Sequence, residues 1–147
     1  MYRSIVIGTD GSETAGEAVR QAIELAKSVG AALHVVGAYQ PVPEQQLRQQ
    51  RQGAPADVQW SINPHQEVDK NLNDARTKVE QAGVKVEVHS REGDPADAIL
   101  NVADDVNADL IVVGNRGMTG ARRFLLGSVP NKISHHARCS VMIIRTT

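Results

Sequence analysis

Short apolar runs alternate along this chain with longer segments whose apolar residues recur every three or four positions. Four of the runs are nearly continuous, at residues 4–8, 32–38, 109–113 and 140–145, whereas residues 84–89 alternate apolar and polar side chains. A continuous run of this length is typical of a parallel strand covered on both faces, and alternation is typical of a strand with one exposed face. We therefore expect five strands, with residues 84–89 at an edge of the sheet.

The segments between these runs carry the start and stop signals of helices. Ser12 can cap the first helix and Gly30 can end it, and the second helix follows Pro64. Asp94 precedes a proline at the start of the third helix, and the fourth begins at about Ser128. Strict alternation of strands and helices predicts an α/β fold, in which a single open, doubly wound parallel sheet of five strands carries helices on both faces.

Composition narrows the class of protein. The 147 residues suit one domain, and an aromatic content of 3% implies a core of aliphatic side chains. A formal net charge of −1 gives no electrostatic case for binding nucleic acid, and no apolar run has the length of a membrane span. We therefore expect no nucleic-acid or membrane partners. The single cysteine, Cys139, suits a reducing compartment, so we expect a cytoplasmic protein.

Residues 40–64 interrupt the alternation with prolines and a run of glutamines. A connection of this length without regular structure is either functional or disordered. Its composition favours a mobile surface loop. The alternative is a lid over a ligand site, in which Trp60 would pin the loop to the body of the protein.

The most distinctive pattern follows the apolar run at residues 109–113. From Gly114 to Ser128 the sequence reads G-x2-G-x9-G-S and leads into the last expected helix. Glycine permits positive φ and close approach of a ligand to the backbone, and a helix N-terminus favours an anion. The pattern therefore indicates a phosphate site, although it is not a P-loop, because Ser128 stands where a P-loop has lysine.

This loop, together with Thr9-Asp10 after the first strand, resembles the ATP-binding branch of the universal stress protein family, over nearly the whole chain. The resemblance implies a Rossmann-like sheet with strand order 3-2-1-4-5 and one nucleotide-binding domain over residues 1–147. It implies that Val35 and Val113 lie by the adenine and contribute backbone contacts, and that Asp10 contacts the nucleotide near the ribose or adenine. The nucleotide-binding residues that it implies are Gly8, Thr9, Asp10, Val35, Val113, Gly114, Arg116, Gly117, Gly127, Ser128 and Val129.

Two residues need separate comment. Many nucleotide-binding members of the family carry proline where this chain has Gly8, and glycine leaves the backbone beside the adenine freer, which affects the affinity for nucleotide and not the ability to bind it. Asp10 has a second role open to it, because a carboxylate at this place can cap the turn formed by Gly11 and Ser12.

The resulting hypothesis is a universal stress protein that binds an adenine nucleotide, with ATP preferred over AMP or a cyclic nucleotide, as a regulatory module of the stress response. We assign no catalytic residues, because the base and metal ligands of a phosphoryl-transfer enzyme are not evident. The alternatives are a slow ATPase and a nucleotide-free member that acts through protein contacts. A Mg²⁺ ion carried by the phosphates would need few protein ligands.

Two further expectations concern metals and assembly. His34, His65 and His89 have no partner at ligand spacing along the chain, so no protein metal site is predicted. The last strand, residues 140–145, is strongly apolar but would lie at a sheet edge in the family's strand order. Pairing with its own copy would cover that edge, so we expect a homodimer through this strand.

Overall fold

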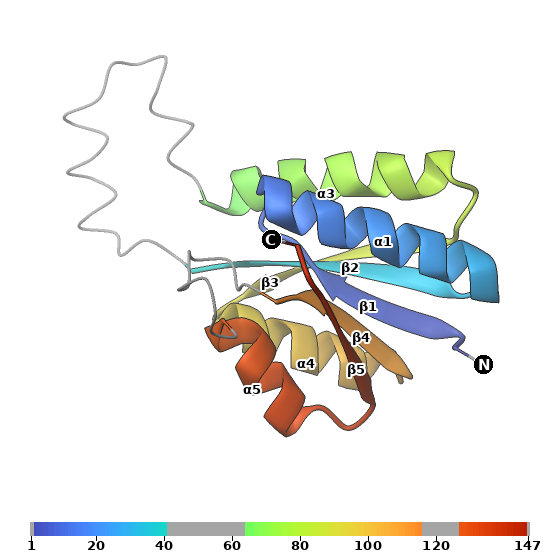
Figure 1. Cartoon of the computed structure of the whole chain (residues 1–147). Coiled ribbons are helices and arrows are strands. Elements are labelled where there is room, and N and C mark those ends of the chain that lie inside the picture. The colour runs from blue at the N-terminus through green and yellow to red at the C-terminus, as the bar shows by residue number, and fades with distance from the viewer. Residues whose placement is uncertain (1, 41–63, 116–126, 147) are drawn as a thin grey trace, which may run out of the picture.

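In the computed structural model the chain folds as three layers, with α1 and α3 on one face of a sheet and α4 and α5 on the other (Figure 1). The description covers residues 2–40, 64–115 and 127–146. Residues 41–63, for which the sequence predicts a surface loop or a lid with Trp60, lie outside it, as do Arg116 and Gly117. The elements in chain order are β1 (Ser4–Gly8), α1 (Glu13–Val29), β2 (Ala32–Tyr39), α3 (Pro64–Gln81), β3 (Val86–Glu92), α4 (Pro95–Asp105), β4 (Leu110–Gly114), α5 (Ser128–His136) and β5 (Ser140–Ile144).

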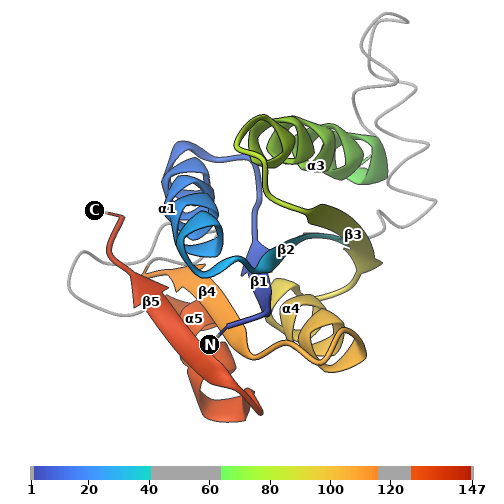
Figure 2. The same ribbon diagram turned by 90° about the vertical axis from the view of Figure 1, so that its right-hand side faces the viewer.

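The sheet confirms the predicted class and strand order. Its five strands run β3-β2-β1-β4-β5, and each neighbouring pair is parallel. From β1 the chain passes outward to β2 and β3, and it then returns to place β4 on the other side of β1 (Figure 2). The strand order therefore reverses between β1 and β4, which is where open α/β sheets bind ligands.

Alternate residues of the central strands pack into two separate aliphatic cores. Ile5 and Ile7 of β1 are fully buried in the core under α1 and α3, whereas Val6 between them is fully buried in the core under α4 and α5. This double burial explains the continuous apolar runs of the central strands. No helix in the described part of the chain is long and apolar enough to cross a membrane.

The predicted caps form the ends of α1 and the start of α4. Ser12 accepts a hydrogen bond from the backbone N–H of Ala15, and Gly30 ends α1 in the left-handed region, at φ 73°. Asp94 caps α4 by accepting from the N–H of Asp97. Side-chain capping of this kind satisfies backbone donors that the helix itself leaves unpaired.

The edge strand β3 begins later than the alternation at residues 84–89 predicts. Val84 donates its N–H to the carbonyl of Val79 in the last turn of α3, so it completes the end of the helix and not the sheet ladder. Gly83, at φ 77°, turns the chain between the two elements. The strand itself runs from Val86 to Glu92 and lies at the edge, as predicted.

Candidate functional site

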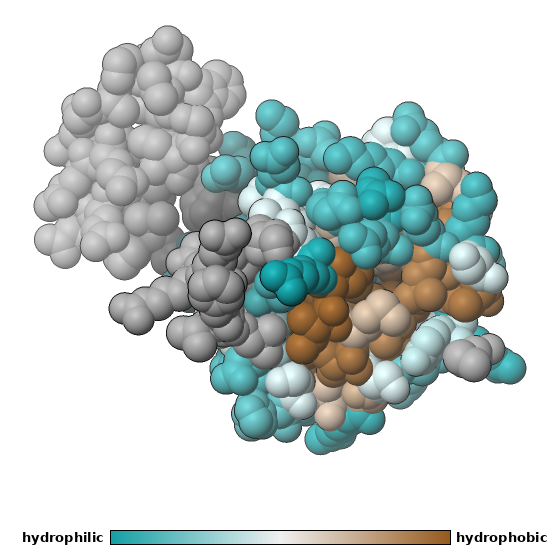
Figure 3. All heavy atoms as spheres, viewed as in Figure 1, coloured by the Kyte–Doolittle hydropathy of each residue, from teal (hydrophilic) through white to brown (hydrophobic). Residues whose placement is uncertain are grey.

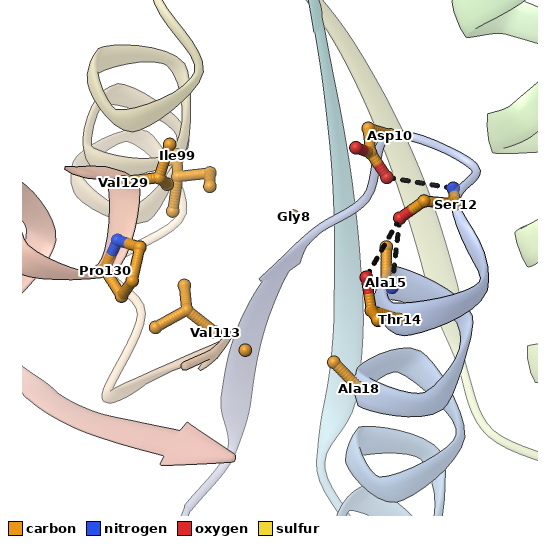
Figure 4. A pocket seen from close by; sticks show the side chains of 11 residues that line it. Gly8, Asp10, Ser12, Thr14, Ala15, Ala18, Ile99, Val113, Val129 and Pro130 are labelled. Carbon is orange, nitrogen blue, oxygen red and sulfur yellow. Dashed lines mark hydrogen bonds between the residues drawn. The ribbon is translucent and has the colours of Figure 1, made fainter. Parts of the chain in front are cut away.

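An open cleft lies at the carboxyl ends of β1 and β4, where the strand order reverses (Figure 4). It holds about 400 Å³ of space between atoms, part of it open to solvent. Its walls come from β1, the first turns of α1, α4, β4 and the start of α5. The lining residues are Gly8, Asp10, Ser12, Thr14, Ala15, Ala18, Ile99, Val113, Gly114, Val129 and Pro130.

The turn after β1 is fixed by its own polar groups. Asp10 Oδ1 accepts from the N–H of Ser12 at 2.9 Å, and Ser12 Oγ accepts from the N–H of Ala15 at 3.2 Å. From α3, Asn71 Nδ2 donates to the backbone carbonyl of Asp10 at 3.2 Å. The turn-capping role of Asp10 is therefore present, and Figure 4 shows the other oxygen of this carboxylate turned away from Ser12.

Asn115 joins the two ends of the glycine-rich loop. Its N–H donates to the carbonyl of Ile144 at 2.8 Å, and its own carbonyl accepts from the N–H of Gly127 at 3.0 Å. Its side-chain Oδ1 accepts from the N–H of Thr146 at 2.9 Å. These bonds bring the end of β4 and the start of α5 together at one side of the cleft.

The first turn of α5 faces the cleft without a side-chain cap. Gly127 is the N-cap residue and makes no side-chain bond, and the first turn of the helix contains no acidic residue. Val129 and Pro130 of this turn line the cleft. Backbone N–H groups at such a helix start are donors for an anion. Gly127 has φ −63°, so close approach, and not a left-handed backbone, is what a glycine offers here.

Four of the expected nucleotide residues, other than Asp10, line the cleft: Gly8, Val113, Gly114 and Val129. The side chains of two others point elsewhere. Val35 is fully buried in the core under α1 and α3, and Thr9 Oγ1 accepts from the N–H of Gly11 at 3.2 Å beside that same layer. Thr9 contributes its backbone instead, because its N–H donates to Val36 at 2.9 Å and ties β1 to β2.

Sequence reasoning missed Ile99, Pro130 and the small residues of the first turns of α1, all of which line the cleft. The signal for them is topological, because helices that follow neighbouring parallel strands begin at the same edge of the sheet. The cationic side chain of Lys132 in α5 is held by acidic residues at the start of α4. Its Nζ lies 2.8 Å from Asp97 and 3.4 Å from Asp94, and hydrogen bonding to Asp97 raises the pKa of Lys132.

A second polar cluster lies away from the cleft, between β2 and β3. His34 Nδ1 and His89 Nε2 are 3.1 Å apart, with the Glu87 carboxylate beside them. Spacing along the chain did not indicate this pairing, because the two histidines are 55 residues apart and only the register of β2 on β3 joins them. Burial lowers the pKa of both imidazoles, against the raising effect of Glu87.

Known proteins resemble this chain over its full length. A family model described as the universal stress protein family matches residues 1–145. Universal stress protein Rv1636 of Mycobacterium tuberculosis is 36% identical over 99% of this chain and 98% of its own length. The crystal structure of a universal stress protein in complex with cAMP has a TM-score of 0.75 and 31% identity, and covers 99% of this chain and 98% of that one.

A third similar protein is the universal stress protein from Archaeoglobus fulgidus in complex with dAMP. Its structure has a TM-score of 0.68 and 26% identity, with 98% of each chain covered. The family match over residues 1–145, the strand order and the cleft at the β1–β4 reversal all point to the same family. This chain belongs to the universal stress protein family.

Proposed function

We propose that this protein binds an adenine nucleotide in the β1–β4 cleft and acts as a regulatory module of the stress response. The observation that carries the proposal is the composition of the cleft walls. Val113, Val129 and Ile99 form an apolar surface suited to a flat base, and Asp10 offers a carboxylate to sugar hydroxyls. The uncapped start of α5 offers N–H groups to phosphate.

The similar structures in complex with cAMP and with dAMP support an adenine ligand. Among the candidates we propose ATP, on the strength of the G-x2-G-x9-G-S loop, with Mg²⁺ carried by its phosphates. Arg116 and Gly117 of that loop are proposed as further contacts, as are Thr9, Val35, Gly127 and Ser128.

Isothermal titration calorimetry with ATP, AMP and cAMP tests the proposal. In Gly127→Val a branched side chain would stand at the start of α5, where phosphate must approach the backbone, so we expect binding to be lost. Asp10→Asn keeps an acceptor for the N–H of Ser12 but removes the charge. A hydrogen bond to a charged group contributes about 1.5–3 kcal/mol, so the affinity should fall about 10- to 100-fold.

The matched control is Gly16→Ala, since Gly16 lies in α1, does not line the cleft and has open space around an added Cβ. It should bind nucleotide as the wild type does. Unchanged affinity in both Gly127→Val and Asp10→Asn would place the ligand elsewhere. A phosphate-release assay on the ATP complex separates a binding protein from a slow ATPase.

We also propose a homodimer formed through β5. This strand ends the sheet, and Met142 and Ile143 are 38% and 41% exposed, the large apolar side chains most open to solvent in the described chain. Figure 3 shows apolar side chains gathered on the face where β5 runs in Figure 1. An apolar edge strand with free backbone groups is a site for pairing with a second chain.

A further inference from the structure

The cluster between β2 and β3 has the chemistry and the placement of a metal site. In the register of these parallel strands His34 pairs with Glu87, and Val36 pairs with His89. Side chains of paired residues point to the same face of a sheet, and every second residue of a strand returns to that face. Val36 lies in the core under α4 and α5, so the three polar side chains gather on that same face, on β2 and the edge strand β3. Figure 2 shows the backbones of β2 and β3 side by side at this end of the sheet.

The distances within the cluster suit a tetrahedral ion. The two ring nitrogens are 3.1 Å apart, and His34 Nδ1 lies 3.7 Å from Glu87 Oε2. One ligand atom from each of the three residues lies within 4.8 Å of the other two. Zn²⁺ bound tetrahedrally at about 2.0–2.1 Å holds its ligand atoms about 3.3 Å apart, so small side-chain rotations would place all three around one ion.

The three side chains of the cluster differ in how tightly the protein holds them. The His34 side chain is only 12% exposed, which holds its ring in place, whereas that of Glu87 is 67% exposed and can turn toward an ion. Arg91 follows on the same face, but its guanidinium bonds the carboxylate of Asp105 at 3.2 Å, which offsets its positive charge. The partly exposed side of the cluster leaves a fourth position for water or an outside ligand.

We propose that His34, Glu87 and His89 form a binding site for a divalent transition ion, Zn²⁺ in the first place. Two neutral imidazoles and one carboxylate are a donor set that Zn²⁺ accepts, with the fourth position open. Such an ion would join β3 to β2 through their side chains in addition to the backbone ladder. This site is separate from the β1–β4 cleft and does not depend on nucleotide binding, because none of its residues lines that cleft.

The test uses the full chain with any affinity tag removed and after treatment with a chelator. Zn²⁺ is titrated by calorimetry, and Co²⁺ is added as a visible probe, since its absorption distinguishes four-coordinate from six-coordinate sites. We expect one ion per chain and a four-coordinate Co²⁺ spectrum. Losing even an outer partner of a ligating histidine costs about 10- to 100-fold in affinity, so His34→Gln or His89→Gln should each cost at least about 100-fold.

Glu87→Gln guards against loss of the fold, because its side chain is largely exposed and its change should leave circular dichroism unaltered while weakening Zn²⁺ binding. The controls are His65→Gln and His135→Gln, which replace exposed histidines outside the cluster and should bind Zn²⁺ as the wild type does. Absence of Zn²⁺ binding in the wild type overturns the proposal. So does an affinity that is unchanged by the cluster variants, or that falls equally in the controls.

Discussion

At the scale of single residues, two glycines near the start of α1 should respond in opposite ways to the same substitution. Gly11 has φ 79°, and a Cβ there would stand 2.5 Å from the side chain of Asn71, which bonds Asp10. In Gly11→Ala, backbone strain and displacement of Asn71 should make the free energy of unfolding about 1–2 kcal/mol lower than in the wild type. Gly16 is helical with open space beside it, so Gly16→Ala should raise that quantity by about 0.5–1 kcal/mol.

Urea unfolding followed by circular dichroism measures both changes. The pair is informative because the two residues lie close together in the chain and lose the same conformational freedom in the unfolded state. Equal shifts in the two variants would show that the left-handed turn at Gly11 and its contact with Asn71 contribute nothing.

Local chemistry also decides which site residues could be read from the sequence. Ser12, Gly30 and Asp94 were predictable because a cap depends on a few neighbouring residues. Strand parity and the placement of α1 and α3 bury the side chain of Val35 in the core, and the backbone contact of Val35 with adenine stays a prediction. The pairing of His34 with a histidine on another strand depends on sheet register, which no single segment encodes.

At the scale of elements, α1 carries an ion-pair network on its exposed face. The Arg20 guanidinium donates to both carboxylate oxygens of Glu17, at 2.7 and 3.0 Å, and to Glu24 at 3.0 Å. Hydrogen bonding to Arg20 lowers the pKa of Glu17 to about 2 from its ordinary 4.5. A carboxylate with a depressed pKa stabilises the fold fully above its unfolded value and loses that contribution as the pH falls toward its folded value.

The expected result is a small extra loss of stability in the wild type between pH 4.5 and about 2, reduced in Glu17→Gln. The pair is exposed, so its effect is modest and should shrink further in high salt. Urea unfolding near neutral pH and again between the two pKa values measures it. Arg20→Gln removes the same pair and should match Glu17→Gln; parallel pH curves for the wild type and both variants would contradict the assignment.

The elements themselves were largely predictable, and the exceptions have physical reasons. The apolar runs of β1 and β4 and the helical repeat of α4 lie where the sequence pattern places them, because burial on two faces demands those side chains. The start of β3 was misplaced because Val84 is apolar and buried whether it ends a helix or begins a strand. The hydrophobic pattern shows that a residue is buried, but the backbone hydrogen bond of Val84 to Val79 determines that it ends α3 and does not begin β3.

At the scale of the whole molecule, the strand order gives the sheet one cleft in its middle and two edges. The reversal between β1 and β4 opens the proposed nucleotide cleft in the middle, whereas β3 and β5 form the two edges. The β3 edge carries polar side chains such as Glu87, but β5 ends the sheet with apolar ones. The two edges therefore differ in chemistry, and only the β5 edge is suited to bury itself against a second copy.

The exposed side chains of β5 favour pairing edge to edge. Met142 and Ile143 are successive residues, so they project from opposite faces of the sheet, and a partner strand continuing the sheet would bring its layers beside both. Twofold symmetry places the same strand on each side of such an interface. A charge on this edge opposes pairing, so Ile143→Lys should shift the protein toward monomer.

Light scattering at micromolar concentration measures the outcome. The wild type should have about twice the 15.9 kDa mass of one chain, and Ile143→Lys a mass near that of one chain. Ile143→Val is the matched control, since it keeps the edge apolar and β-branched and should remain dimeric. A wild type with the mass of one chain would sink the proposed dimer, and a dimer that survives Ile143→Lys would move the interface away from β5.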